Sequence, residues 1–364
     1  MNPLLEILQQ GQSIWLDLLD RKMMDSGTLQ SLIDDDGLRG ITSNPAIFEK
    51  AISNSSDYDA DIAKLSEKED DNEAIFFGLA VKDIQRAADF FKPIYEETNG
   101  EDGFVSLEVS PFLARDTEGT VQQARELWKK VDRKNVMIKI PGTKEGLPAI
   151  RQCIGEGINI NVTLLFGLPR YKEVVDAYLG GLENRVDAGQ SIDHVASVAS
   201  FFLSRIDVVV DPMLEEKGLT ELKGEVAIAS AKKAYQIYQG IFSSDRFKKL
   251  EKRGAKTQRV LWASTGVKDP SFSDVKYVEA LIGPETVNTL PMDTLEAFRD
   301  HGRVAIELTE NMDHVNEVMA RLEENGIDID TITQNLEDEG IEKFNKPFEK
   351  LLDGIEAQKQ KTVP

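Results

Sequence analysis

Eight short apolar segments, several of them rich in β-branched residues, recur along this chain between stretches of helical periodicity. Apolar segments of this length that are bounded by turn residues are typical of buried strands. We predict strands at residues 13–19, 38–44, 104–110, 136–140, 158–166, 195–202, 260–265 and 287–291. The spacing of apolar residues predicts amphipathic helices at residues 72–97, 120–128, 171–179 and 226–241.

Strands and helices that alternate in this way favour a (β/α)₈ barrel over the competing doubly wound sheet. The early strands are not followed by G-x-G-x-x-G, the usual dinucleotide-binding sequence of a doubly wound sheet. We therefore expect residues 1–364 to form a single (β/α)₈ (TIM) barrel domain with additional N-terminal and C-terminal helices. The connection 46–102 is expected to supply extra helices, and the acidic tail from residue 313 is expected to dock on the barrel.

The charge balance restricts the classes of partner. The net charge of −21 argues against nucleic acid or an anionic membrane as the main partner, but a few local cations can still bind a phosphorylated metabolite. Cys153 is the single cysteine, so no intramolecular disulfide can form, and we expect it to be a buried, small apolar residue. Neither a signal peptide nor a long apolar stretch is recognisable, so a cytoplasmic location is expected.

Metal chemistry has little support in the sequence. The three histidines lie far apart, and neither H-x-x-x-H nor C-x-x-C occurs. This disfavours a dedicated zinc site. We expect neither a metal nor another cofactor.

Lys139 is the one charged residue in the apolar run 136–140. Lysine is rarely buried without a partner or a function. Burial disfavours its charged form, and a neutral amine is a nucleophile whose natural target is a carbonyl carbon. Lys139 therefore indicates Schiff-base chemistry. The alternative is a structural lysine that extends from a strand end or pairs with a carboxylate.

Further polar residues lie near the carboxyl ends of the predicted strands, where a barrel has its active site. They are Asp17, Thr42, Asn44, Glu108, Asn161, Thr163, Ser200 and Ser264. Each has a structural alternative. Asp17 could cap a helix, Asn44 could form a turn with Pro45, and Glu108 could form an ion pair. Asn161 and Thr163 could satisfy backbone groups. Together with Lys139 they match the nucleophile and acid/base groups that imine chemistry needs.

Six segments in order resemble the transaldolase family, over roughly residues 11–300. They are 13–17 (SIWLD), 40–45 (GITSNP), 107–109 (LEV), 137–141 (MIKIP), 157–166 (GININ VTLLF) and 262–265 (WAST). The resemblance implies a (β/α)₈ barrel. It also implies transfer of a dihydroxyacetone unit between sugar phosphates, with no cofactor, in the pentose phosphate pathway.

The resemblance also assigns roles to individual positions. Lys139 is similar to the Schiff-base lysine, and Asp17 to the base that takes the C4 hydroxyl proton. Glu108 is similar to the acid/base that acts through a water, and Thr163 to the residue that positions this water. Asn44 and Asn161, and more weakly Thr42, resemble residues that hold substrate hydroxyls.

The phosphate end resembles the family less closely. Residues 200–207 (SFFLSRID) are similar to a segment in which Ser200 and Arg205 bind phosphate, although Arg205 could instead pair with Asp207 or a helix-end carboxylate. Better-known members carry an arginine soon after the residue equivalent to Ser264. Here Lys268 is the cation that could replace it.

Two other functions compete with this one. The first is an aldolase that releases dihydroxyacetone, similar to fructose 6-phosphate aldolases, whose sequences differ around Glu108 and Phe202. The second is a catalytically silent barrel that binds sugar phosphates or a protein, against which the presence of Lys139, Asp17 and Glu108 argues. The expected state is a monomer or a homodimer.

Overall fold

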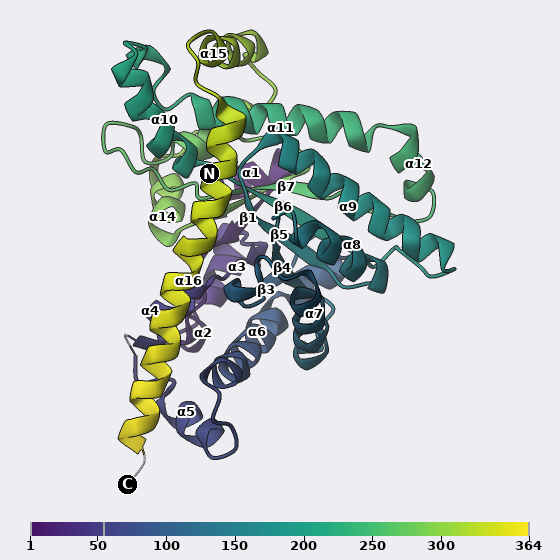
Figure 1. The fold of residues 1–364 in the computed structure, drawn as a ribbon, viewed down its shortest axis with the longest axis vertical. Coiled ribbons are helices and arrows are strands. Elements are labelled where there is room, and N and C mark those ends of the chain that lie inside the picture. The colour runs from purple at the N-terminus through teal and green to yellow at the C-terminus, as the bar shows by residue number, and fades with distance from the viewer. Residues whose placement is uncertain (1, 54, 363–364) are drawn as a thin grey trace.

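Eight parallel strands close into one barrel in the order β1 to β8 (Figure 1). The structure is a computed structural model and describes residues 2–53 and 55–362. The strands are β1 (Gln12–Leu16), β2 (Gly40–Ile41), β3 (Phe104–Glu108), β4 (Val136–Pro141), β5 (Ile160–Leu165), β6 (Ser197–Phe202), β7 (Arg259–Ala263) and β8 (Thr286–Leu290). β1 and β8 pair from Gln12 and Thr286 to Leu16 and Leu290. The predicted (β/α)₈ barrel is confirmed.

Each predicted strand is present, but six of the eight are shorter than expected. The first strand ends at Leu16. The Asp17 amide still donates to the Leu290 carbonyl (2.8 Å), but a helix starts four residues later, at Arg21. The second spans only Gly40–Ile41. The Thr42 amide still donates to the Leu16 carbonyl (2.9 Å), but a helix starts three residues later.

Helices surround the barrel (Figure 1). They are α1 (Pro3–Gln9), α2 (Arg21–Asp25), α3 (Thr28–Asp36), α4 (Pro45–Ser53), α5 (Asp59–Ser66), α6 (Asn72–Glu97), α7 (Thr117–Val131), α8 (Gly146–Glu156), α9 (Leu168–Asp187), α10 (Ser204–Glu216), α11 (Val226–Phe242), α12 (Asp245–Glu251), α13 (Lys276–Ala280), α14 (Met292–His301), α15 (Met312–Glu324) and α16 (Ile329–Thr362), with 3₁₀ turns η1 (Pro111–Leu113) and η2 (Thr220–Leu222). Cys153 on α8 is buried as expected, and burial raises the pKa of its thiol to about 12.

The long connection 46–102 differs from the expectation that all of its helices are extra. α6 links β2 to β3 and packs against β3 and α7, so it is the regular crossover helix at this position. Only α4 and α5 are additional. We propose that the whole chain is one domain, since the buried apolar side chains form one cluster.

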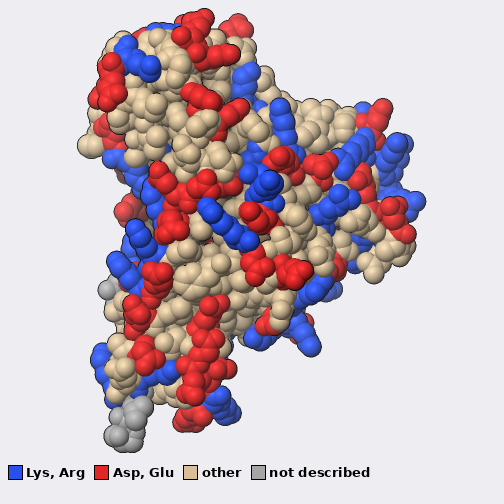
Figure 2. Space-filling view, in the orientation of Figure 1, with Lys and Arg blue, Asp and Glu red and all other residues tan. Residues whose placement is uncertain are grey.

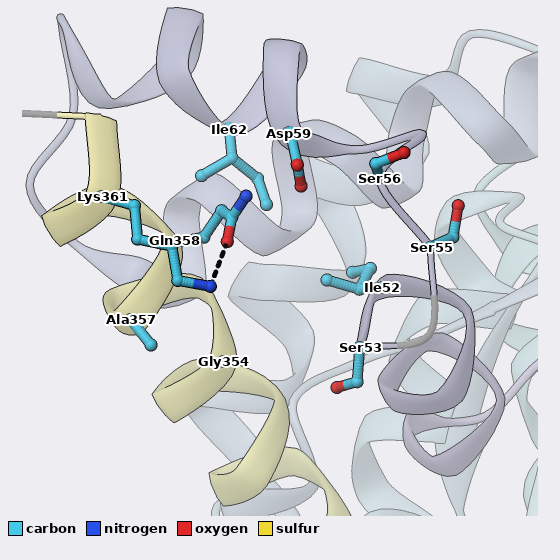
Figure 3. A pocket seen from close by; sticks show the side chains of 10 residues that line it. All are labelled: Ile52, Ser53, Ser55, Ser56, Asp59, Ile62, Gly354, Ala357, Gln358 and Lys361. Atoms are coloured by element: carbon cyan, nitrogen blue, oxygen red, sulfur yellow. Dashed lines mark hydrogen bonds between the residues drawn. The ribbon is translucent and has the colours of Figure 1, made fainter.

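The C-terminal helix α16 runs along one side of the molecule and crosses the barrel elements (Figure 1). It packs against α4, α5, α6, α10 and β5, so the tail docks back on the barrel as predicted. Its last turns border a pocket of about 470 Å³ that side chains of α4, α5 and α16 line together (Figure 3). The C-terminal helix α16 therefore packs against α4 and α5, which lie in the first fifth of the chain.

Acidic and basic side chains are interspersed over the face of the molecule seen in Figure 2. Within residues 2–53 and 55–362, no helix has both the length and the apolar character that a membrane span requires.

A buried polar network ties β1 to the start of β3 and β7 at the amino ends of the strands. The carboxylate of Asp102 accepts bonds from Ser13 Oγ (2.7 Å), Trp15 Nε1 (3.3 Å) and Arg259 Nη2 (2.9 Å). We expect Asp102→Ala to lower the free energy of unfolding by about 3 kcal/mol, because it leaves the Arg259 charge, which is only 12% exposed, without its carboxylate partner. Urea unfolding followed by circular dichroism measures this.

A surface pair provides the matched control. Asp89 also accepts two bonds from an arginine, Arg133 (2.6 and 3.0 Å), but Asp89 is exposed and Arg133 is partly exposed. Asp89→Ala is expected to cost less than about 1 kcal/mol, because water replaces the lost contact. Equal losses in the two variants would contradict the stabilising role of the buried network.

Candidate active site

A cavity of about 150 Å³ opens at the carboxyl ends of the strands. Nine of the eleven predicted site residues line it: Asp17, Thr42, Asn44, Lys139, Thr163, Ser200, Arg205, Ser264 and Lys268. The other two contact these residues directly, Glu108 through Lys139 and Asn161 through Ser200. A barrel brings the ends of separate strands to one place, which explains why residues far apart in sequence meet here.

Lys139 lies on β4 between two fully buried isoleucines, and its own side chain is only 5% exposed. Its Nζ donates to the Ser43 carbonyl (2.9 Å) and lies 3.3 Å from Glu108 Oε2. Glu108, Lys139 and Asn161 are direct register partners on β3, β4 and β5, so the three side chains share one side of the sheet. The amine is thus buried, beside a carboxyl group and at the wall of a cavity.

Glu108 is also buried, and neither of its carboxyl oxygens makes a hydrogen bond of regular geometry with a described residue. Burial raises the pKa of Glu108, the nearby Lys139 opposes this rise, and Asp17 adds to it. A second cavity of about 10 Å³ adjoins Glu108, but neither Lys139 nor Thr163 lines it. A carboxyl group with a raised pKa holds its proton to a higher pH than an ordinary glutamate, so it can act as an acid as well as a base.

Asp17 follows the last residue of β1. Its Oδ1 accepts a bond from Thr42 Oγ1 (2.7 Å), which also contacts Thr289 Oγ1 (2.8 Å). Burial raises the pKa of Asp17, and the positive charges of Lys139 and Arg205 oppose this rise. The alternative role as a helix cap is wrong, because Asp20 caps α2.

Asn161 and Thr163 lie on β5 and differ in their contacts. Asn161 accepts a bond from Ser200 Oγ (2.7 Å) and donates to Ser106 Oγ (3.0 Å), so it binds side chains and not the backbone. Thr163 Oγ1 is buried and has no hydrogen-bond partner among the described residues. A register shift between Val162 and Leu165, with φ of 52° at Leu164, bends β5 next to Thr163. Bulges of this kind redirect side chains at active sites.

Asn44 makes the predicted turn contact and also lies at the cavity. Its Oδ1 accepts a bond from the Ile47 amide (3.1 Å) in the first turn of α4, which is the expected turn contact. Its side chain nevertheless lines the cavity.

Arg205 is a cation in the cavity lining, in the first turn of α10. Its guanidinium carbon lies 5.4 Å from the ring centre of Phe202 and 5.7 Å from that of Phe344. Nη1 is buried without a hydrogen-bond partner among the described residues. Burial lowers the pKa of Arg205, and Asp17 opposes this.

The alternative pairing of Arg205 with Asp207 is wrong. The Asp207 carboxylate accepts bonds from Tyr277 Oη (2.7 Å) and the Ala227 amide (2.8 Å) instead. Arg205 therefore retains a charge that can bind an anion in the cavity.

Ser264 and Lys268 complete the cavity after β7. Ser264 has a φ of 56°, and its Oγ lies 2.8 Å from Ser204 Oγ. Lys268 is exposed at the rim. The structure thus brings a second cation to the same cavity as Arg205.

Four contributors to the site were missed by the sequence reasoning. They are the carbonyl of Ser43, the hydroxyls of Ser106 and Thr289, and the ring of Phe344. The alternation of inward residues along β3 and β8 could have indicated Ser106 and Thr289. No local pattern could have indicated Phe344, because only the docking of α16 brings it to the cavity.

The sequence of the chain matches one family over most of its length. Residues 14–355 match the family described as transaldolase/fructose-6-phosphate aldolase. The chain belongs to this family. Three similar proteins are a transaldolase of Trichodesmium erythraeum (50% identity, 100% of this chain and 99% of that protein), a transaldolase of Saccharopolyspora erythraea (49%, 96% and 95%) and transaldolase 2 of a Nostoc species (47%, 98% and 98%).

Family membership agrees with the resemblance drawn from six short segments, and the match spans all eight strands except the start of β1. In the described part of the chain, no group of three or more histidine, cysteine or carboxylate side chains is arranged to hold a metal ion.

Proposed function

We propose that this chain is a transaldolase. It transfers a dihydroxyacetone unit from sedoheptulose 7-phosphate to glyceraldehyde 3-phosphate, which gives erythrose 4-phosphate and fructose 6-phosphate in the non-oxidative pentose phosphate pathway. The observation that carries the proposal is the buried Lys139 amine, 3.3 Å from Glu108 and on the wall of the cavity that Asp17 also lines. The full-length relatives named transaldolase support it.

The chemistry starts at Lys139. Its amine attacks the C2 carbonyl of the ketose, and the resulting carbinolamine loses water to give a protonated imine. Glu108 moves the protons of this dehydration through a water, a role that its raised pKa and its position 3.3 Å from the Lys139 amine support. Thr163 is proposed to orient this water with its unpartnered hydroxyl.

Cleavage requires a base at the C4 hydroxyl. Asp17 takes this proton, the C3–C4 bond breaks, and its electron pair moves into the imine to form an enamine. The aldose phosphate leaves, and the three-carbon fragment stays on Lys139. Attack of the enamine on the aldehyde carbon of an acceptor then reverses the sequence. Asn44, Asn161 and Thr42 are proposed to hold the hydroxyls of the sugar.

Retention of the three-carbon fragment distinguishes transfer from an aldol cleavage that releases free dihydroxyacetone. Water must not protonate the enamine, and a small, enclosed site serves this purpose. The cavity of about 150 Å³ is partly walled by the C-terminal helix, which supports such protection. Arg205, Ser200, Ser264 and Lys268 are proposed to bind the phosphate of both substrates at one end.

Borohydride trapping tests the proposal. The protein is incubated with fructose 6-phosphate without an acceptor, reduced, and mapped by mass spectrometry. We expect a three-carbon adduct on the peptide that contains Lys139. Folded protein that gives no adduct on any lysine, with either fructose 6-phosphate or sedoheptulose 7-phosphate, would instead favour a catalytically silent binding barrel.

The aldolase alternative differs only in the fate of the fragment. The family includes fructose-6-phosphate aldolases by description, and such an enzyme would release free dihydroxyacetone. The presence of Glu108 and Phe202 favours transfer. An assay for free dihydroxyacetone, with and without erythrose 4-phosphate, separates the two: release without acceptor supports the aldolase.

Glu108→Gln is expected to slow imine formation by about 10²-fold or more, because the amide cannot exchange protons with the water beside it. Single-turnover trapping at a series of times measures the rate of adduct formation at Lys139. Glu126→Gln, the same change at an exposed glutamate outside the cavity, is the control. Unchanged trapping kinetics in Glu108→Gln would remove Glu108 from the imine steps.

A cytoplasmic location and a monomeric or homodimeric state are part of the same proposal. The buried single cysteine and the mixed surface charge are compatible with both. Sedimentation velocity of the purified chain distinguishes monomer from dimer.

A further inference from the structure

One face of α16 lies against the barrel elements that build the active site. Along this face, Thr333 approaches Gly167, Glu337 pairs with Arg170 (3.0 Å), and Gly340 approaches Leu164. A Cβ atom added at Gly340 would lie 2.9 Å from Leu164 Cδ2 and 3.9 Å from Arg205 Nη1. The helix thus lies close to Leu164 and Arg205 at this position, and its next turn brings Phe344 to the cavity.

The Arg205 guanidinium, whose Nη1 is buried, is held in an unusual way for a charged group. No described carboxylate forms an ion pair with it, and it lies within 6 Å of the ring centres of Phe202 and Phe344. An aromatic face attracts a guanidinium without neutralising it. A carboxylate partner would hold the arginine equally well, but it would compete with an incoming phosphate.

We propose that Phe344, together with Phe202, positions Arg205 for the phosphate of the substrates, and that α16 thereby sets the preference of the enzyme for phosphorylated sugars. This inference rests on the proposed function. Phe344 is a positioning residue, since it acts through Arg205 and does not take part in the imine chemistry at Lys139.

The inference separates phosphate binding from imine chemistry. Loss of the Phe344 ring should let the guanidinium move out of line with the cavity, so that phosphate binds more weakly. The reaction of Lys139 with the carbonyl group should proceed once the site is saturated. Phe344→Leu keeps an apolar side chain on α16, whereas Phe344→Tyr keeps the aromatic face.

The experiment compares two acceptors that differ in the phosphate group. The protein is loaded from saturating fructose 6-phosphate while a coupled dehydrogenase removes the released triose phosphate. It is then mixed with erythrose 4-phosphate or with erythrose. In Phe344→Leu, we expect the concentration of erythrose 4-phosphate that gives half of the maximal transfer rate to rise about tenfold. The corresponding concentration of erythrose should change less than about twofold. Phe344→Tyr should behave like the unchanged protein.

Ile355→Ala is the control for a loosened helix, because Ile355 is fully buried on α16 but does not line the cavity. It should leave the ratio of the two acceptors unchanged. The proposal is overturned if Phe344→Leu weakens both acceptors equally, or neither, or if Ile355→Ala shifts the ratio as strongly.

A binding measurement keeps this test independent of turnover. Calorimetric titration with inorganic phosphate should show about tenfold weaker binding to Phe344→Leu than to the unchanged protein. If the unchanged protein fails to load from fructose 6-phosphate, the proposed function fails, yet this titration still decides the role of Phe344. Equal phosphate affinities would refute that role.

Discussion

Replacement of Lys139 by alanine should abolish transfer, with a loss on the order of 10⁵-fold or more, because the variant has no nucleophile to form the imine. Lys268 also lines the cavity, but it is exposed at the rim and is proposed to bind phosphate, whereas Lys139 is buried beside Glu108. Transfer from fructose 6-phosphate to erythrose 4-phosphate, followed by coupled detection of the released triose phosphate, measures the loss.

A second buried lysine supplies the control. Lys232 on α11 is also 5% exposed, but its Nζ donates to the Glu310 carbonyl (3.0 Å) and it does not line the cavity. Lys232→Ala should retain transfer in the fraction of protein that folds, and its circular dichroism should match that of Lys139→Ala. An active Lys139→Ala would end the Schiff-base mechanism, whatever the control shows.

Asp17→Asn should block cleavage and leave imine formation intact. The expected loss of transfer is roughly 10²–10⁴-fold, because an amide cannot accept the C4 hydroxyl proton. The change preserves size, and the amide oxygen can still accept the bond from Thr42 Oγ1. Borohydride trapping with fructose 6-phosphate should therefore yield a six-carbon adduct on Lys139, where the unchanged protein yields a three-carbon adduct.

The raised pKa of Asp17 also sets the direction of the pH dependence. The base is active only when it is deprotonated, so cleavage should fall as the pH drops through this raised pKa, above the ordinary range of an aspartate near pH 4. Glu108 has a raised pKa as well, so the loss of activity at low pH reports the titration of Asp17 and Glu108 together.

Asp36→Asn is the control for both measurements. Asp36 is a buried carboxylate that accepts a bond from Arg299 (2.7 Å) outside the cavity, so its replacement should change neither the trapped adduct nor the pH dependence of cleavage. A three-carbon adduct on Asp17→Asn would refute its role in cleavage.

The barrel was predictable because each strand carries its own local signal. The run around Lys139 is apolar throughout, and the segments that became β5 and β6 are long and rich in apolar residues. The sequence did not indicate which strand α6 packs against. Its helical periodicity was plain over Asn72–Glu97, but periodicity does not say which strand a helix covers. The contact of α6 with β3 made it a regular crossover helix.

Most of the candidate site was predictable for a related reason. Once a residue is known to end a strand of a parallel barrel, the fold brings it to the same rim as the other strand ends. Asp17, Glu108 and Lys139 are of this kind. The contacts of Arg205 were open, because a sequence cannot distinguish an arginine that pairs with Asp207 from one held between two aromatic rings.

The sequence by itself thus determined the succession of strands and helices, the chemical types of the groups in the cavity and the family of the chain, because local periodicity and residue chemistry are written in short segments. Only the tertiary structure decided that Thr42 meets Thr289, 247 residues away, and that the Ser43 carbonyl receives the bond from Lys139. It also decided that a C-terminal helix supplies Phe344 to Arg205. These contacts depend on closure of the barrel and on the packing of α16, in which every element contributes at once, and no single segment contains that information.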